Sequence, residues 1–169
     1  MYKTMDKYID EIIYGGMDGI LTTVSIISGV YGSNINVVYA FILGIANLLA
    51  DGFSMGISRY LSLSRKQNNM NAIIRGLYTF LSFCILGGIP VLSLYFCIDS
   101  VDSESRFCNS ASILFLFVTT LCFVLIGYIK ALYMTKTYMK TITETLMIGF
   151  IGVYISYYVS YKMKEYLIK

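Results

Sequence analysis

The most constraining feature of this chain is a series of apolar runs, each about twenty residues long, separated by short charged clusters. A helix of that length rises about 30 Å, the thickness of the hydrocarbon core of a bilayer. Hydrophobic residues make up 57% of the 169 residues and charged residues 14%, proportions that a water-soluble domain does not have. Because backbone groups in lipid must be hydrogen-bonded within their own segment, the chain is predicted to be an all-α integral membrane protein.

Five membrane spans are expected, and together they form a single transmembrane domain over residues 1–169. The uncharged segment GSNIN lies between the first two spans and predicts a tight turn, so these spans form an antiparallel hairpin. Residues 64–76 form a short basic loop, in which Arg65, Lys66 and Arg75 would repel a cation or bind anionic lipid headgroups. The expected spans cover residues 12–31, 37–63, 77–97, 113–132 and 145–161.

The distribution of Lys and Arg indicates how the spans are oriented. An odd number of spans puts the termini on opposite sides, and a cytoplasmic N-terminus then places most of the thirteen basic residues on the cytoplasmic side. Lys162, Lys164 and Lys169 would lie on the far side and argue against this orientation. Because they are outnumbered, we expect the N-terminus to be cytoplasmic.

The cysteine and histidine content excludes several kinds of site. The chain has four cysteines, no C-x-x-C pair and no histidine. The usual Cys/His zinc sites are therefore excluded, and no nucleophile and base are discernible for an enzyme. Cys97 and Cys108 flank a hydrophilic loop and could form a disulfide if that loop faces an oxidising lumen. The net charge of +3 is spread over loops, so nucleic-acid binding is not expected.

Two acidic residues lie inside the apolar runs, Asp18 in YGGMDGILTT and Asp51 in LLADGFSMG. A charge at the centre of a membrane helix costs about 2.5 to 3.5 kcal/mol, so two such residues indicate a function. Asn47, Asp51 and Met55 follow one another at i, i+4 and i+8 and therefore share one helix face. Within the second span, Arg59 is the only basic residue that could serve as a counterion.

Glycines surround both acidic residues. The spacings Gly15-x-x-x-Gly19 and Gly52-x-x-x-Gly56 allow neighbouring helices to approach closely. We expect this approach to bring the polar face of the second span against Asp18 of the first.

Each of these polar residues also has a structural interpretation. Asp18 could be the N-cap of a helix that starts at Gly19. Asp51 and Asn47 could hydrogen-bond neighbouring helices, and Met55 could be a packing residue. Their occurrence together on two adjacent helices favours an ion path instead. Oxygen ligands combined with a thioether suit ferrous or manganous ion better than magnesium or calcium.

Charge balance predicts a two-fold homodimer. One Asp18 per chain leaves a divalent ion short of one negative charge, and a second copy facing the same axis would supply it. The metal is then a transported ion, and no cofactor is expected.

The segments YGGMDGILTTVSIISGVYGS and FILGIANLLADGFSMGISRYLS resemble the first two helices of the vacuolar iron transporter family. The segments TFLSFCILGGIPVLSLYF, LFVTTLCFVLIGYIKALY and ETLMIGFIGVYISYYV are similar to its third, fourth and fifth helices. The resemblance implies a five-helix homodimer that moves Fe²⁺, and often Mn²⁺, out of the cytosol into a vacuole-like compartment by proton antiport. It also implies an ion path between the protomers, with Asp18 and Met55 as ligands.

The resemblance has one large departure. Well-known family members insert a glutamate-rich metal-binding domain between helices two and three, where this chain has only SRKQNNMNAIIRG. Cytosolic metal capture by such a domain is therefore not expected here. Asp51 is expected to act as a second ligand or a proton carrier, and Asn47, where some members have glutamate, as an oxygen donor.

Two alternatives remain for the function. The chain could be a membrane scaffold that keeps the fold without transporting, in which case the acidic residues only join helices. It could also be a divalent-cation channel without proton coupling.

Overall fold

The computed structural model describes residues 7–65, 69–98, 109–135 and 137–167. Within these residues, five helices are long and apolar enough to cross a membrane, which confirms the predicted all-α membrane fold. A short π-helical segment, η1, covers Ala131–Thr135 and extends the fourth of them. The five are α2 (Ile9–Gly32), α3 (Val37–Ser64), α4 (Asn69–Ile98), α5 (Asn109–Lys130) and α6 (Tyr138–Leu167).

Several helices extend beyond the expected spans. α4 begins at Asn69, so most of the basic loop expected at 64–76 is helical, and α6 begins at Tyr138 rather than near residue 145. The expected spans were bounded by apolar residues alone, whereas a helix can continue past them when its polar side chains find partners. α2 likewise starts at Ile9, so Asp18 lies within the helix and the N-cap alternative is wrong.

The turn between α2 and α3 has the tight geometry that GSNIN predicts. Asn34 adopts φ of 57°, a left-handed conformation that asparagine tolerates better than most residues. The Asn36 side chain then accepts a hydrogen bond of 2.9 Å from the backbone N–H of Val38 and caps α3. Together these two residues reverse the chain within one short connection.

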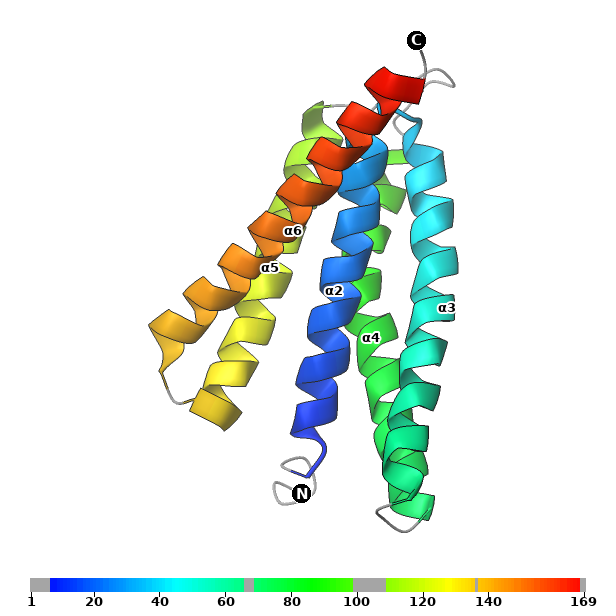
Figure 1. Ribbon diagram of the computed structural model, residues 1–169. Coiled ribbons are helices and arrows are strands. Elements are labelled where there is room, and N and C mark those ends of the chain that lie inside the picture. Colours follow the sequence, from blue (N-terminus) through cyan, green and yellow to red (C-terminus); the bar gives the residue numbers. More distant parts are fainter. Residues whose placement is uncertain (1–6, 66–68, 99–108, 136, 168–169) are drawn as a thin grey trace.

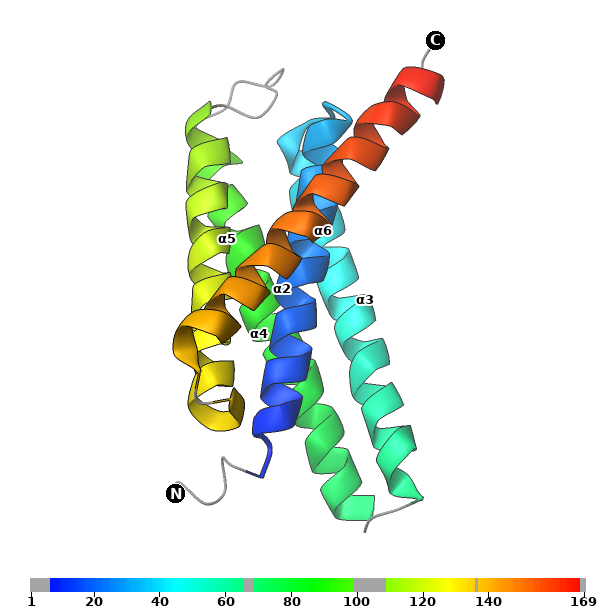
Figure 2. The ribbon, with the colours of Figure 1, turned by 60° about the vertical axis from the view of Figure 1, so that its left-hand side comes forward.

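α2 lies at the centre of the bundle. It packs on α4 most extensively and also contacts α3, α5 and α6. Figure 1 shows α3 on one side of α2 and the pair α5 and α6 on the other, with α4 behind; Figure 2 shows α6 crossing obliquely in front of α2. The described N-terminal and C-terminal ends lie at opposite ends of the bundle. α2 therefore has a covered back and a front that lies between α3 and α6.

The glycines fit α2 and α3 onto α4 rather than onto each other. A Cβ on Gly19 would lie 2.4 Å from the carbonyl oxygen of Phe83 in α4. A Cβ on Gly56 would lie 3.0 Å from the carbonyl oxygen of Gly76, also in α4. The expectation that these glycines join the two polar faces is therefore wrong. Their seams face α4, and the acidic residues lie on other sides of the same helices.

Most large side chains of the outer surface are hydrophobic, as expected of helices that face lipid. The buried core is a narrow seam where α2 meets α4 and α5, and it includes Ile20, Val24, Leu94, Phe123 and Ile126. α6 contributes little to it, because its buried residues are only Thr141, Thr145 and Gly149 among those described. Side chains such as Phe53, Phe117 and Ile155 are more than half exposed instead.

Candidate functional site

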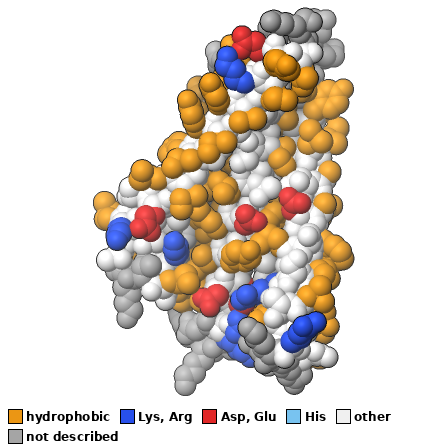
Figure 3. All heavy atoms as spheres, viewed as in Figure 1, with side chains coloured by type: hydrophobic (Ala, Val, Ile, Leu, Met, Phe, Trp, Pro, Cys, Tyr) orange, Lys and Arg blue, Asp and Glu red, His pale blue; other side chains and the backbone are white. Residues whose placement is uncertain are grey.

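Asp18 of α2 and Asp51 of α3 lie on the open front of the bundle. Both side chains are partly buried, and they are close enough to interact electrostatically. Neither forms an ion pair with a Lys or Arg that the structure describes. Figure 3 shows acidic side chains at mid-height on this face, and the basic side chains visible in that view lie elsewhere on it. Two like charges are thus held together within the membrane-spanning part.

Asn47 contacts Asp51 directly. Its side-chain amide donates a hydrogen bond of 2.8 Å to Oδ2 of Asp51, four residues later in α3. The predicted i, i+4 relation is therefore a real contact. Because the amide N–H occupies Oδ2, Oδ1 of Asp51 and the amide oxygen of Asn47 remain as acceptors. This pair can offer two oxygen ligands from one helix.

Met55 lies one turn further along α3 and lines a different part of the front. It borders a hollow of about 550 Å³ between the beginning of α2 and the end of α3. Asp10 and Tyr14 of α2 line the same hollow, as do Ser58 and Arg59 of α3. The hollow thus combines a carboxylate, a thioether, hydroxyls and one guanidinium.

A second hollow, of about 570 Å³, lies toward the other end of the front, between α2, α3 and α6. Asn47 lines it and also binds Asp51, so the second hollow begins beside the acidic pair. The front therefore carries two polar hollows, with Asp18 and Asp51 between them along the helix axes. Asn47, Asp51 and Asp18 are brought together, while Met55 lines the first hollow.

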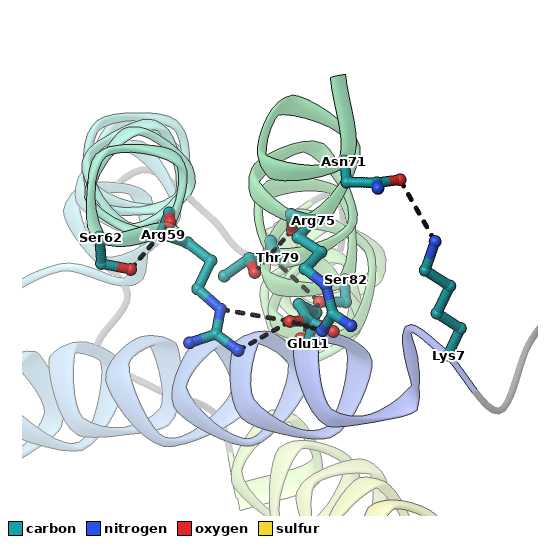
Figure 4. A network of polar contacts seen from close by, with 8 residues as sticks. All are labelled: Lys7, Glu11, Arg59, Ser62, Asn71, Arg75, Thr79 and Ser82. Atoms are coloured by element: carbon teal, nitrogen blue, oxygen red, sulfur yellow. Dashed lines mark hydrogen bonds and ion pairs between the residues drawn. The ribbon is translucent and has the colours of Figure 1, made fainter. Parts of the chain in front are cut away.

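A buried charge cluster at the same end as the first hollow escaped the sequence analysis (Figure 4). Glu11 of α2 is fully buried, and its Oε1 accepts hydrogen bonds from Nη2 of Arg59 at 2.7 Å and Nη1 of Arg75 at 2.6 Å. Nε of Arg59 adds a third bond at 3.2 Å. Arg59 is therefore the counterion of Glu11 and not of Asp18 or Asp51. One carboxylate joins α2, α3 and α4.

Arg75 was expected to be a loop residue, and this expectation is wrong. Its guanidinium points into the bundle, lies 5.7 Å from the ring centroid of Tyr8 and is only 16% exposed. The signal was present in the sequence, because Glu11 precedes Asp18 by seven residues and so shares its side of α2. A second acidic side chain on the same side of a membrane helix predicts basic partners on the neighbouring helices.

The expectation of a disulfide concerns Cys97 and Cys108, whose side chains lie outside the described residues. Two other cysteines, Cys84 and Cys122, carry free thiols. The thiol of Cys84 is directed at the carbonyl oxygen of Leu48, 3.7 Å away, so it joins α4 to α3.

The donor set of one chain is small for a metal centre. In the part of the chain that the structure describes, no three Asp, Glu, Cys or His side chains converge. The pair of carboxylates can balance one divalent ion in charge, but it leaves most coordination positions to amide, thioether, hydroxyl or water. Such a site can hold an ion briefly and let it leave.

Comparison with known proteins gives matches over most of the chain. A model of the VIT family matches residues 9–75 and 63–161, which include all five long helices in whole or in part. The two matches meet at the connection between α3 and α4.

Three curated relatives are each named vacuolar iron transporter. The protein from Plasmodium falciparum (isolate 3D7) is 43% identical over 81 residues, which are 42% of this chain and 30% of that protein. The protein from Plasmodium berghei (strain Anka) is 42% identical over 62 residues, 36% of this chain and 23% of its own length. The protein from Toxoplasma gondii (strain ATCC 50861 / VEG) is 33% identical over 70 residues, 41% of this chain and 23% of its own length.

The chain thus spans less than a third of the length of each of these relatives. All three names denote a transporter, and none denotes an enzyme. The family model, in contrast, accounts for well over half of the residues and for the helices that carry Asp18, Asp51 and Met55. The chain is therefore a multi-pass membrane protein that belongs to the VIT family.

Proposed function

We propose that this chain transports Fe²⁺, with Mn²⁺ as a second cargo, across an endomembrane and out of the cytosol. The observation that carries the proposal is the pair Asp18 and Asp51. Neither is neutralised by a described basic side chain, and a polar hollow lies on either side of them along the bundle. Carboxylates are tolerated at such a depth when a cation or proton repeatedly neutralises them.

The names of the relatives support iron as the proposed cargo. Relatives of this chain are named vacuolar iron transporters, and the thioether of Met55 beside a path of oxygen ligands suits a first-row transition metal. Asp18 and Met55 are the proposed primary ligands. Asp51 is a second ligand or a proton carrier, and Asn47 both orients Asp51 and offers its amide oxygen. The metal passes through and is not a resident cofactor.

The same pair of carboxylates supports the proposal of proton antiport. When the metal leaves, two neighbouring carboxylates would repel one another unless protons replaced it. Exchange of one divalent ion for two protons keeps the charge of the site constant. A gradient of protons into the cytosol could then drive metal out of it.

A second copy of the chain would complete the coordination. One chain brings two carboxylates to the front, and the front of α2 is the part that α3 and α6 leave open. A two-fold homodimer with both fronts facing its axis would place the path between the protomers. The N-terminus would lie in the cytoplasm, as the distribution of basic residues suggests.

The test is metal flux into proteoliposomes that contain the purified chain. Asp18→Asn and Asp51→Asn should each slow Mn²⁺ uptake by at least about tenfold, which corresponds to about 1.4 kcal/mol of lost stabilisation. Glu144→Gln is the matched control, because this carboxylate is exposed on α6 and lines neither hollow. Met55→Leu keeps the volume of the side chain and removes the sulfur. It should slow Fe²⁺ uptake while leaving the stability of the fold nearly unchanged.

The design also separates the alternatives. Uptake that responds to an imposed pH gradient supports antiport, whereas uptake that ignores the gradient identifies a channel. If neither the wild-type chain nor Asp18→Asn takes up metal, the chain is a scaffold. If both take up metal equally, Asp18 is not a ligand. Either result contradicts the proposal.

A further inference from the structure

The hollow between α2, α3 and α6 is lined by hydroxyl groups. Thr22 and Ser25 come from α2, and Ser156 and Ser160 come from α6 at i and i+4. Asn47 of α3 closes the hollow on the side of Asp51. Its volume of about 570 Å³ is large enough for many water molecules, since each takes about 30 Å³ in the liquid.

These four hydroxyls lack the partner that membrane helices usually give them. Several hydroxyls elsewhere in the bundle bond back to the carbonyl four residues earlier, as Thr23 does to Gly19 and Thr120 does to Leu116. Ser33, which also lines the hollow, does the same to Gly29. No hydrogen bond to a described residue is made by four hydroxyl-bearing residues that line the hollow, two from α2 and two from α6: Thr22, Ser25, Ser156 and Ser160. Within lipid an unpaired hydroxyl is unfavourable, so the four indicate water in the hollow.

Glycines allow hydroxyl-bearing residues to lie where α2 and α6 cross. Where α6 crosses α2, a Cβ on Gly29 would lie 3.0 Å from Oγ of Ser160, and a Cβ on Gly152 would lie 3.7 Å from Oγ of Ser25. At this crossing, a hydroxyl of each helix therefore faces a glycine of the other. The hydroxyls therefore form a shared wall rather than isolated polar groups.

We infer that this hollow is a water-filled vestibule through which a hydrated divalent cation passes between Asp51 and the membrane surface near the C-terminus. The presence of water in the hollow is inferred from the unpaired hydroxyls and does not depend on the proposed function. Only the identity of the ion rests on that function. Hydroxyl and amide oxygens carry no net charge, so they accept hydrogen bonds from metal-bound water but displace it poorly. The vestibule thus conducts and releases an ion without trapping it.

Cysteine accessibility tests the water directly. Ser156→Cys and Ser25→Cys, in the chain reconstituted in lipid vesicles, should react with a membrane-impermeant cationic methanethiosulfonate at least about tenfold faster than Thr120→Cys, because thiols react as thiolates in water. Thr120 is the matched control, a hydroxyl on α5 that bonds back to its own helix. Peptide mass spectrometry assigns each modification and separates it from the four native cysteines, which are Cys84, Cys97, Cys108 and Cys122.

Flux measured in the same vesicles distinguishes the two levels of the inference. Modification of Ser156→Cys should reduce Mn²⁺ uptake severalfold, while reagent treatment of Thr120→Cys should leave uptake unchanged. Modification at position 156 without any metal uptake, before or after treatment, supports the vestibule and contradicts the proposed function. Rates at positions 25 and 156 no faster than at 120 overturn the vestibule, even where metal uptake is normal, because lipid or protein then fills the hollow.

Discussion

At the scale of single residues, Glu11 has the most demanding environment of the charged groups described. Its side chain is fully buried, Oε1 accepts from two guanidiniums and Oε2 has no partner within the described structure. Removing one member of a buried ion pair is destabilising because the remaining charges lose their compensation. The two arginines come from α3 and α4, so their repulsion would act on the packing of both helices.

Glu11→Ala should therefore lower the stability of the bundle by about 3 kcal/mol. The measurement is the midpoint of thermal unfolding in detergent, monitored by size-exclusion chromatography. Asp10→Ala is the control, since this neighbour is exposed and makes no ion pair with the residues described. Equal midpoints for the two variants would show that the charge cluster contributes no stability.

Arg59 and Arg75 bind the same carboxylate but differ in what else they face. Arg59 lines the hollow that contains Met55, whereas Arg75 lies over Tyr8. The charge of Arg59 should raise the energy of a cation entering that hollow.

Arg59→Gln should accordingly raise the initial rate of Mn²⁺ uptake at low metal concentration by about threefold, with the effect shrinking as salt is added. Arg75→Gln also removes one positively charged partner of Glu11, and it should leave the uptake rate near that of the wild type. The measurement is uptake into proteoliposomes at two ionic strengths. A similar change in both variants would assign the effect to folding and not to the field in the hollow.

At the scale of helices, α2 and α4 approach each other closely where Gly19 meets Gly87. A Cβ on Gly87 would lie 2.7 Å from the carbonyl oxygen of Gly19, a backbone atom that cannot move aside alone. A Cβ on the adjacent Gly88 would meet only Cδ2 of Leu48 at 3.7 Å, an ordinary contact. These neighbours are therefore a matched pair.

Gly87→Ala should destabilise the bundle by about 1 to 3 kcal/mol through overpacking. Gly88→Ala should be neutral or stabilising by less than about 1 kcal/mol, because alanine is the better helix former. Unfolding midpoints of both variants decide the matter. If Gly88→Ala lowers the stability as much as Gly87→Ala does, close packing of α2 against α4 does not explain the need for glycine at position 87.

Hydrophobic runs predicted the number and order of the helices well, because burial in lipid needs only length and composition. The relation of Asn47 to Asp51 was also predictable, since it lies within one helix. Partners between helices were not: which side of α2 faces α4 depends on close contacts such as that of Gly19 with Phe83, and no single helix reveals it. The role of Arg75 was missed because the expected span began at residue 77, whereas α4 begins at Asn69.

At the scale of the whole molecule, the five crossings fix where the two termini lie. The described ends of the chain are at opposite ends of the bundle (Figure 1), and the charge cluster of Glu11 lies at the N-terminal end. Most basic residues described belong to this end, and Lys162 and Lys164 belong to the other. This asymmetry supports the proposed orientation, in which the N-terminal end faces the cytoplasm.

A small epitope tag at the N-terminus should be digested when protease is added to the cytoplasmic side of intact vesicles, and a tag at the C-terminus should be protected. Both tags should be digested once detergent opens the vesicles, which controls for tag accessibility. The opposite pattern would invert the proposed direction of entry and exit, and digestion of both tags in intact vesicles would contradict five crossings.

Glu11 fastens three helices at one end of the bundle, while α6, which borders the vestibule at the other, buries few of its residues. Stiffness is therefore distributed unevenly along the bundle. If the protein alternates between inward-open and outward-open forms, the end held by Glu11 stays rigid. The movement of α6 relative to α2 then exposes the transported ion.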